Sequence, residues 1–474
     1  MNSQTINRID DKIYPNLGLG YISSYLESKQ ISNTIIDFNV IDMKYRDVYE
    51  YVIENNYTAV GISTYYFNYK NALKIINRLR TRSKELFIFL GGYLPTLSHE
   101  SMQNLLDQVN CFVIGEGEIT TYEMLLAVQN NNPLSQVKGL VYKDINGNIV
   151  KTQKRELIHN LDTLPFPNRD IYNNISTETC IIASRGCFHS CSFCAISSYT
   201  DSCIGKKMRF RSAANVMKEI EELSEKGYQT FQLIDDNFIF SSKLFREFID
   251  LLKNREERFC FYSSVSADQV IKYPDQVQKF MQYGLSSVFC GFESFLDKHL
   301  EFYNKKISAE QNIEAYYILG EMGIEYQFGH LIFNPITTIN DIEQICDVLD
   351  SLKFYSNCEF FRSPMFLNSS VISTEGTPLF DYIRHNNLSS TNKLGYRFID
   401  KMVEQRYPLY QEWTEKVKIL YHHVNEIENN DTKNELLYQI SRMDIHANHD
   451  ITLRGQVSSH HQNQLKQFAQ KIKI

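Results

Sequence analysis

The sequence predicts an α/β protein with a doubly wound sheet at the N-terminus, a central open barrel of six strand–helix units, and a mostly helical C-terminal part. Short apolar or β-branched runs alternate with segments of helical periodicity through the first 130 residues, and the same alternation resumes from Thr179. The last hundred residues lose the strand pattern and keep a helical one. Six strands are too few for a complete eight-stranded barrel but enough for an open one.

In the first part, the expected helices lie near 17–29, 47–55, 69–83 and 99–108, and the expected strands near 33–38, 59–64, 86–90 and 111–114. Apolar strands between helices indicate a parallel sheet that is covered on both faces. Ligands of such sheets bind at the carboxyl ends of the strands. The polar loops at 63–64, 91–96 and 115–118 are therefore expected to line one crevice, although an ordinary sheet with polar loops stays an alternative.

The pattern changes after residue 130, which places the first domain at 1–130. Two alternating runs around Asn146-Gly147 predict a β-hairpin, and the LPFP segment at 164–167 breaks regular structure, so 131–175 is expected to be a hairpin and linker. The barrel is expected at 176–370, with strands near 179–184, 230–235, 259–265, 287–292, 326–333 and 358–366 and helices near 211–226, 242–254, 274–282, 308–322 and 339–352. Residues 371–474 form the expected helical region, which would close the barrel and contact substrate; its helices are expected at 398–407 and 409–428, before a weakly patterned stretch after His446.

Composition excludes several classes of protein. The 474 residues include 49 Lys and Arg against 56 Asp and Glu, and this net charge of −7 argues against nonspecific binding to nucleic acid or to an anionic membrane. No apolar run approaches the roughly eighteen residues that span a bilayer, and the first eleven residues carry no signal-peptide core. We therefore expect a cytoplasmic protein without nucleic-acid or membrane partners.

Three of the ten cysteines lie within eight residues, as Cys187-x3-Cys191-x2-Cys194, directly after a predicted strand. Thiolates at this spacing on one loop can hold three irons of an iron–sulfur cube, which leaves the fourth iron open to a small molecule. Zinc is the rival metal, although no second pair of ligands is present; a fourth ligand could come from Cys203, Cys180 or His189. A purely structural triplet is the third interpretation.

This loop, with the aromatic Phe193 before its third cysteine, resembles that of the radical S-adenosylmethionine (SAM) enzymes. The resemblance extends to MRFRS at 208–212, LIDDNF at 233–238, FCGFES at 289–294, and HLIFNP at 330–335 with Thr337-Thr338. It implies a [4Fe–4S] cluster on Cys187, Cys191 and Cys194 that chelates SAM and cleaves it to a 5′-deoxyadenosyl radical. An external one-electron donor of flavodoxin or ferredoxin type would then be a partner.

The same resemblance implies the residues that contact SAM, with Phe193 lying against the adenine and acceptors after the second strand holding the ammonium group. These residues are Phe193, Asp235, Asp236, Asn237, Ser266 and Glu293. Paired aspartates also fit a solvated turn or a helix N-cap, and Ser264 is a further residue at the pocket mouth. Relatives often carry a basic residue near the end of the third strand, where this chain has Ser264-Val265-Ser266, so the cation that pairs with the SAM carboxylate is not identified.

The N-terminal part resembles the Rossmann-like cobalamin-binding domains that precede radical SAM barrels, in PNLGLG at 15–20, VGIST at 60–64, GGYLPT at 91–96 and IGEGE at 114–118. The implied cobalamin contacts are Ser63, Thr64, Gly91, Gly92, Thr96, Glu116 and Gly117. Many such domains offer a histidine to cobalt in an Asp-x-His-x-x-Gly loop, which is absent here because no histidine precedes His99. Either the loop at 65–68 covers the lower face of cobalt without a strong donor, or the domain is an empty relic.

Together the resemblances imply a cobalamin-dependent radical SAM enzyme, with methyl transfer to an unactivated carbon of a small-molecule or peptide intermediate as the leading interpretation. A ring rearrangement or cyclisation without methyl transfer is the alternative. Transfer RNA methylthiolation fits less well because only Cys111 lies before residue 180, and the intact cysteine triad argues against a cobalamin sensor or carrier. No catalytic side chain is identified, and the pairs His422-His423 and His460-His461 are expected on solvated helix faces.

Overall fold

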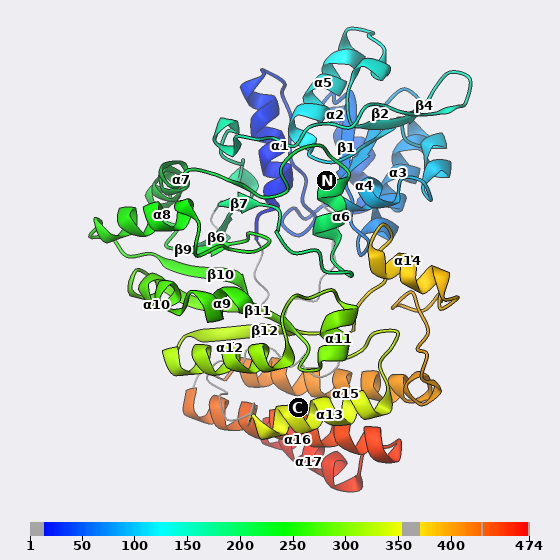
Figure 1. Cartoon of the computed structure of the whole chain (residues 1–474). Coiled ribbons are helices and arrows are strands. Elements are labelled where there is room, and N and C mark those ends of the chain that lie inside the picture. The colour runs from blue at the N-terminus through cyan, green and yellow to red at the C-terminus, as the bar shows by residue number, and fades with distance from the viewer. Residues whose placement is uncertain (1–13, 174, 353–369, 428–429, 473–474) are drawn as a thin grey trace.

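A computed structural model describes residues 14–173, 175–352, 370–427 and 430–472 of the chain (Figure 1). Its N-terminal sheet has the strand order β1-β2-β3-β4-β5. The first three strands are parallel and are β1 (Ala59–Ser63), β2 (Phe87–Gly91) and β3 (Cys111–Val113). The predicted hairpin around Asn146-Gly147 forms β4 (Leu140–Lys143) and β5 (Ile149–Lys151), and β4 pairs antiparallel with β3. The hairpin therefore extends the first sheet.

Helices cover both faces of this sheet, so the expected doubly wound arrangement is confirmed. Two of them, α1 (Leu17–Ser28) and α5 (Gly117–Gln129), pack against each other. On the other face, α2 (Val48–Glu54) and α3 (Tyr69–Arg82) bury Val52, Ile76 and Leu79 against strand residues such as Ile62. Helix α3 shows the clearest apolar stripe, since it buries Ala72, Ile75, Ile76 and Leu79, and this stripe is the helical periodicity that the sequence shows here.

Two predictions for this domain are wrong. Residues 33–38 form no strand, and only Asp37 makes a single bridge; the Asn33 side chain donates to the Ser23 and Ile31 carbonyls. The expected helix at 99–108 is reduced to a 3-10 turn, Gln103–Asp107. Instead, the expected polar loop at 91–96 contributes most of helix α4 (Tyr93–Ser98), which tolerates Pro95 in its first turn.

The central sheet is parallel throughout, with the order β12-β11-β10-β9-β6 among the described residues. Its strands are β6 (Glu178–Ile181), β9 (Thr230–Leu233), β10 (Cys260–Ser266), β11 (Leu285–Glu293) and β12 (Glu325–His330). The short strands β7 (Ser184–Arg185) and β8 (Arg209–Phe210) form a separate antiparallel pair. Five of the predicted strands are thus confirmed, and the sixth, at 358–366, lies outside the described residues.

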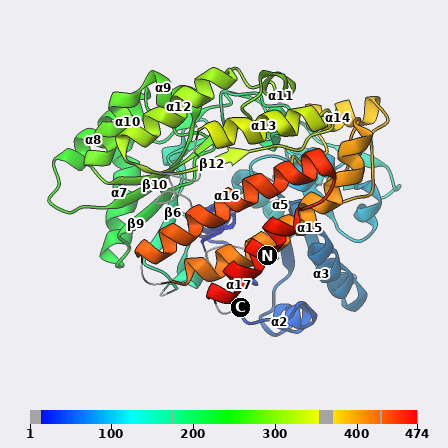
Figure 2. The same cartoon turned by 90° about the horizontal axis from the view of Figure 1, so that it is seen from below.

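The predicted barrel helices are confirmed as α7 (Ala213–Glu225), α8 (Lys243–Lys253), α10 (Pro274–Gln282), α12 (Ala309–Met322) and α13 (Ile339–Ser351). Three short helices, α6 (Ala195–Asp201), α9 (Ala267–Lys272) and α11 (Asp297–Phe302), follow strand ends or the cysteine loop. Figure 2 shows the longer helices along one side of the sheet. On β11, Val288 and Phe292 are buried in this helical layer while Phe289 is 46% exposed, so alternate side chains face an open lumen.

The C-terminal part is more helical than the sequence predicts. It contains α14 (Pro378–His385), α15 (Lys401–Asn425), α16 (Asn430–Arg454) and α17 (Ser459–Ile472). The two helices predicted at 398–407 and 409–428 are one helix, because buried packing of Val403 and Tyr410 holds the chain helical across Pro408. The stretch after His446 is also helical, since α16 packs on α13 and α15.

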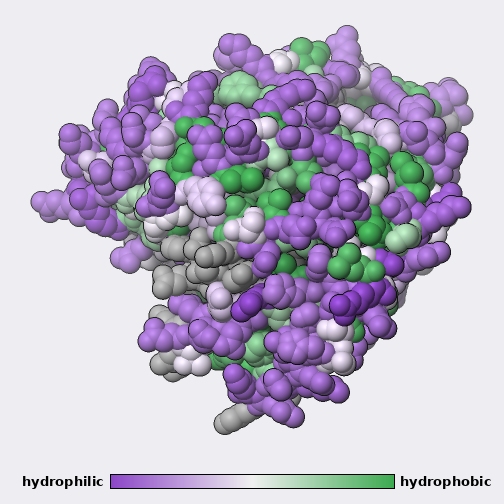
Figure 3. All heavy atoms as spheres, turned by 60° about the horizontal axis from the view of Figure 1, so that its bottom comes forward, coloured by the Kyte–Doolittle hydropathy of each residue, from purple (hydrophilic) through white to green (hydrophobic). Residues whose placement is uncertain are grey.

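Figures 1 and 2 show these helices beside α13, at the β12 end of the central sheet. The paired histidines lie on partly or fully exposed positions, as predicted, where His422 approaches Glu426 and His461 approaches Asp450. On the side seen in Figure 3 the surface is mainly hydrophilic, and hydrophobic side chains gather near the middle of the view. Among the described residues, no helix is both long and apolar enough to cross a membrane.

Candidate functional site

The cysteine loop leaves β7 through a turn that only glycine can make. Gly186 has φ +91°, and a Cβ there would lie 1.9 Å from the carbonyl oxygen of Lys207. The loop carries Cys187 and Cys191 and ends at Cys194, which is the N-cap residue of α6. The three thiols therefore gather between the carboxyl end of the first barrel strands and the start of a helix.

The three thiols are free and partly or fully buried, and their electrostatic influence on one another shows that they are neighbours. Burial raises the pKa of all three, that of Cys191 to about 11. Among the described residues, no group of three or more His, Cys, Asp and Glu side chains is arranged to hold a single metal ion. Three thiols on one short loop are the donor set of an iron–sulfur cluster, and binding iron would stabilise their thiolate forms.

The loop is held by the segment that follows β11. The Ser192 amide donates to the Tyr303 carbonyl at 2.8 Å, and its hydroxyl donates to the Phe302 carbonyl at 2.9 Å. The Asn304 amide donates to the Ser190 carbonyl at 2.8 Å. Cys191, which lies between the two serines, is therefore positioned by residues more than a hundred positions away.

Directly after this segment lies Lys305, a buried cation that the sequence does not single out. Its Nζ lies 3.2 Å from the Glu293 carboxylate and 3.0 Å from the Gly291 carbonyl, and its side chain is 9% exposed. Its positive charge lowers the pKa of Cys191 and of Cys187, against the larger effect of burial. Lys305 thus supplies a positive charge beside the thiols.

Glu293 is placed for this pair by an irregularity of β11. The pairing of β11 with β12 shifts register between Gly291 and Glu293, and Glu293 has φ +63°. A left-handed non-glycine residue costs of order 1 kcal/mol, and such strain is found at functional sites. A Cβ on Gly291 would lie 2.8 Å from the Glu293 carboxylate, so the missing side chain makes room for the pair.

In the segment Asp235-Asp236-Asn237, the first residue is buried and bonded to the protein. Asp235 is 3% exposed, and its carboxylate accepts hydrogen bonds from the Ala183 amide and the Ser184 hydroxyl. Burial raises the pKa of Asp235 to about 6. Its carboxylate therefore joins the start of the cysteine loop to β9, and a contact between Asp235 and SAM stays a prediction.

Asp236 and Asn237 remain available to a ligand. Asp236 is exposed and holds the Gly186 amide at 2.8 Å. Asn237 is 4% exposed, its Nδ2 donates to Ser266 Oγ at 3.2 Å, and its buried Oδ1 has no hydrogen-bond partner among the described residues. An unpaired buried oxygen is costly unless a ligand donates to it.

The remaining predicted SAM contacts lie around this point. Ser266 is the last residue of β10, and Ser264 is half-buried on the same strand. Phe193 is half-buried and packs edge-on against Tyr303, with ring centroids 5.2 Å apart. The structure thus gathers Asn237, Ser266 and Phe193 around the cysteine loop without assigning their ligand.

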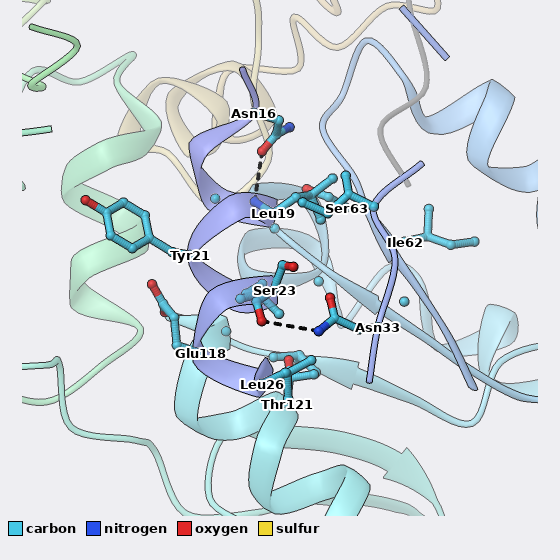
Figure 4. Close-up of a pocket in the computed structure, with 18 of the residues that line it drawn as sticks. Asn16, Leu19, Tyr21, Ser23, Leu26, Asn33, Ile62, Ser63, Glu118 and Thr121 are labelled. Atoms are coloured by element: carbon cyan, nitrogen blue, oxygen red, sulfur yellow. Dashed lines mark hydrogen bonds between the residues drawn. The ribbon is translucent and has the colours of Figure 1, made fainter. Parts of the chain in front are cut away.

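A cavity of about 1240 Å³ runs from the cysteine loop deep into the N-terminal domain. It exceeds the usual range for drug-sized ligands, about 300–1000 Å³. Figure 4 shows residues of α1, β1 and α5 around it, among them Leu19, Ser23, Ile62, Ser63 and Thr121. The sequence motifs mark the strand ends, but they do not reveal the slot between α1, α5 and the sheet.

The end of this cavity nearest the barrel is formed by the barrel domain itself. Arg185, Gly186 and Asp236 line it together with Ser63, Gly91 and Gly92 of the N-terminal domain. The cavity and the cysteine loop thus share residues. This shared boundary could not be read from either motif alone.

Five of the seven predicted cobalamin contacts line the cavity, namely Ser63, Gly91, Gly92, Glu116 and Gly117. Thr64 and Thr96 do not. Thr64 is fully buried and donates to the Gly91 carbonyl at 3.1 Å. Thr96 donates to the Gly92 carbonyl and accepts from the Gly115 amide. Both threonines tie the loops together, and their role as cofactor contacts stays a prediction.

Glu116 lines the cavity, but protein groups occupy its carboxylate. Arg209 approaches it at 2.8 and 3.0 Å, Arg185 at 3.0 Å, and the Ile158 amide donates at 2.7 Å. Burial alone would raise the pKa of Glu116, but the two arginines hold it below its usual value. With Glu118, which pairs with Arg185 at 2.7 Å, Glu116 binds the N-terminal domain to the cysteine loop. Because Glu116 also lines the cavity, its contact with cobalamin stays a prediction.

Aromatic side chains line the wall of the cavity near the cysteine loop. The Tyr65 ring lies 5.7 Å from that of Tyr93, which lies 4.7 Å from that of Tyr199 on α6. Of the predicted covering loop at 65–68, only Tyr65 lines the cavity among the described residues, and Asn68 is buried against the backbone. None of the described residues lining the cavity is His, Cys or Met. The cavity is thus lined to hold a large organic cofactor, and these residues offer its metal no strong side-chain ligand.

Two family models match the chain on the two sides of this boundary. The B12 binding domain matches residues 11–125, and the radical SAM superfamily matches residues 181–349. These ranges contain the slot of the N-terminal domain and the cysteine loop, respectively.

Two curated proteins match this chain over several hundred residues. An uncharacterized methyltransferase of Pyrococcus horikoshii is 26% identical over 411 residues, which cover 85% of this chain and 86% of that protein. An anaerobic magnesium-protoporphyrin IX monomethyl ester cyclase of Synechocystis is 25% identical over 276 residues, covering 57% of this chain and 52% of that protein.

Among solved structures, the cobalamin-dependent S-adenosylmethionine radical enzyme OxsB, with aqua-cobalamin and SAM bound, matches with a TM-score of 0.79 and 18% identity. The match covers 100% of this chain and 75% of that chain, so the two share their fold. The chain is therefore a radical SAM enzyme that carries a B12 binding domain ahead of its radical SAM domain.

Proposed function

We propose that this enzyme uses cobalamin and SAM to transfer a methyl group to an unactivated carbon of a small-molecule or peptide substrate. One observation carries the proposal: the cavity of the B12 binding domain ends at the cysteine loop, where Arg185, Gly186 and Asp236 form its wall. Cobalamin in this cavity and SAM at the cysteine loop would therefore lie next to each other. The electron donor and the substrate would be the partners, without nucleic acid or membrane.

The cysteine loop would hold the cluster through Cys187, Cys191 and Cys194. When bound, the cluster supplies the electron that cleaves SAM, and cobalamin supplies a methyl carrier. The unpaired Asn237 Oδ1 and the Asp236 carboxylate would accept from the SAM ammonium group, and Phe193 would cover the adenine. Lys305 would be the cation that pairs with the SAM carboxylate. The remaining task of the chain is to exclude water from these groups.

The slot of the N-terminal domain would hold cobalamin. Ser63, Gly91, Gly92 and Gly117 lie at the strand ends, and the apolar part between α1 and β1 offers Leu26 and Ile62 to the cofactor tail. Tyr65 would cover the lower face of cobalt without a strong donor. A nitrogen-ligated cobalt in the spectrum of the loaded protein would contradict this arrangement.

The share of each chain that is covered favours methyl transfer over cyclisation. The relative that shares most of both chains is named a methyltransferase, and the cyclase shares about half of each. Both reactions would produce 5′-deoxyadenosine, but methyl transfer also produces S-adenosylhomocysteine. A rearrangement that releases 5′-deoxyadenosine without S-adenosylhomocysteine would replace our proposal with the alternative.

The first experiment is anaerobic reconstitution with iron, sulfide and hydroxocobalamin, followed by desalting and measurement of iron, sulfide and corrinoid. We expect about four irons and one retained corrinoid per chain. The control replaces Cys187, Cys191 and Cys194 with alanine, which should remove the iron and leave the corrinoid. Retention of iron without corrinoid in the wild-type protein would refute the role of cobalamin.

A further inference from the structure

Helix α3 of the B12 binding domain carries a row of positive charges that lowers its own helical stability. Helix α3 contains five cations and no acid, and four of the cations recur at every fourth position, as Lys70, Lys74, Arg78 and Arg82. Residues four apart lie on the same face, where like charges destabilise a helix by a few tenths of a kcal/mol per pair. In a chain with a net charge of −7, this ladder is a local concentration of positive charge.

Few acidic partners neutralise the ladder. Arg78 pairs with Glu50 at 3.1 Å, and Arg82 lies over the Tyr49 ring. Lys70 and Lys74 are exposed, and within the described ranges neither has an acidic side chain in ion-pair distance. Figure 1 shows α3 on the outside of the N-terminal sheet, away from α15–α17. The ladder is thus open to a partner.

The N-terminal end of the ladder adjoins two exposed aromatic side chains. Tyr66 is 54% exposed and Phe67 is 53% exposed, directly before the first turn of α3. The Phe67 ring stacks on Tyr65, with centroids 5.3 Å apart and an interplanar angle of 10°. Aromatic side chains are enriched in the cores of protein interfaces, and charged side chains belong to the rim.

From Phe67 a continuous series of rings runs inward. Tyr65 contacts Tyr93, and Tyr93 contacts Tyr199, at the centroid distances given above. Tyr65, Tyr93 and Tyr199 line the cavity, and Tyr199 lies on α6, whose N-cap is Cys194. The series therefore joins the exposed surface to the wall of the cavity and to the helix that begins after Cys194.

We infer that Tyr66, Phe67, Lys70 and Lys74, the "donor surface", dock an acidic protein that carries a reduced flavin. This rests on the proposed function, in which the enzyme consumes electrons. One electron would leave the flavin hydroquinone, which becomes the semiquinone and releases a proton, and would enter the metal cofactors inside the enzyme. Nucleic acid also binds cations, but its binding would not explain a series of rings that leads into the cavity.

The test compares two reductants with the reconstituted full-length enzyme. In the Lys70→Glu/Lys74→Glu variant, we expect the KM for reduced flavodoxin to rise about tenfold, since electrostatic steering changes association rates by 10-fold or more. The limiting rate of 5′-deoxyadenosine formation, and the rate with Ti(III) citrate, should not change. The control is Lys218→Glu/Lys243→Glu, an equal charge reversal at side chains 68% and 80% exposed on the barrel helices.

Equal KM values for wild-type protein and both variants would overturn the inference. So would a variant that loses binding to bulk transfer RNA while its KM for flavodoxin is unchanged, since the ladder would then serve nucleic acid. Absence of 5′-deoxyadenosine with Ti(III) citrate would refute the proposed function instead. Binding of oxidised flavodoxin, followed by its flavin fluorescence, tests the donor surface in that case, and we expect the Lys70→Glu/Lys74→Glu variant alone to lose it.

Discussion

The ion pairs of Glu116 offer a direct test of what joins the two domains. Glu116 is 6% exposed and holds Arg209, which is 3% exposed, at 2.8 Å. The change Glu116→Gln keeps the shape of the side chain and removes its charge. Because Arg209 then stays buried without its counterion, we expect the free energy of unfolding to fall by about 3–5 kcal/mol, the range for removing one partner of a buried pair.

The matched control is Glu156→Gln, which breaks an ion pair of the same length, 2.8 Å to Lys138, at side chains that are 57% and 39% exposed. Water already solvates both of these charges, so Glu156→Gln should lower the free energy of unfolding much less. Urea unfolding of the cofactor-free proteins, followed by far-ultraviolet circular dichroism, measures both changes. Equal losses for the two variants would refute the reasoning that burial gives the Glu116 pairs their strength.

The pH dependence provides a second measurement on the same variant. The pKa of Glu116 lies below its usual value of 4.5 in the folded chain. Its contribution to stability is therefore complete above pH 4.5 and is lost as the pH falls through the folded pKa. The difference between wild type and Glu116→Gln should be constant from pH 6 to 8 and should shrink in acid.

Three further outcomes are expected. Lys305→Met should weaken SAM binding to the reconstituted enzyme roughly tenfold or more, about 1.4 kcal/mol for each factor of ten, whereas Lys305→Arg should retain most of the affinity by calorimetry; equal affinities would remove Lys305 from the site. Gly186→Ala should lower the iron content after reconstitution because its Cβ has no room, while Gly147→Ala, which has a similar φ and nothing within 4 Å, should not. Burial raises the pKa of Asp444 to about 7, above its unfolded value of 3.8, so its stabilising effect is lost as the pH rises toward and through 7. The gain in urea resistance of Asp444→Asn over wild type should therefore grow as the pH rises from about 4 to about 7 and level off above it, and a gain that does not vary over this range would contradict this assignment.

The order of strands and helices could be predicted because it depends on local periodicity. Five barrel strands, their helices, the first sheet and the cysteine loop each show a pattern within ten to twenty residues. The errors arose where distant contacts override local preference. Pro408 lies inside α15 because packing on both sides holds the helix, and the stretch after His446 is helical because α13 and α15 cover it.

The sequence by itself determined the chemistry that the chain can perform, since the three cysteines, their spacing and the glycine-rich strand ends identify the family. Only the tertiary structure decided which polar side chains are free to perform it. Asp235, Thr64, Thr96 and Glu116 lie in the right motifs, but partners brought by the fold occupy them, such as Arg209, 93 positions from Glu116. Lys305 lies in no motif, and folding places it beside the thiols. The physical reason is that a motif specifies backbone position, whereas the availability of a side chain depends on the groups that long-range packing brings to it.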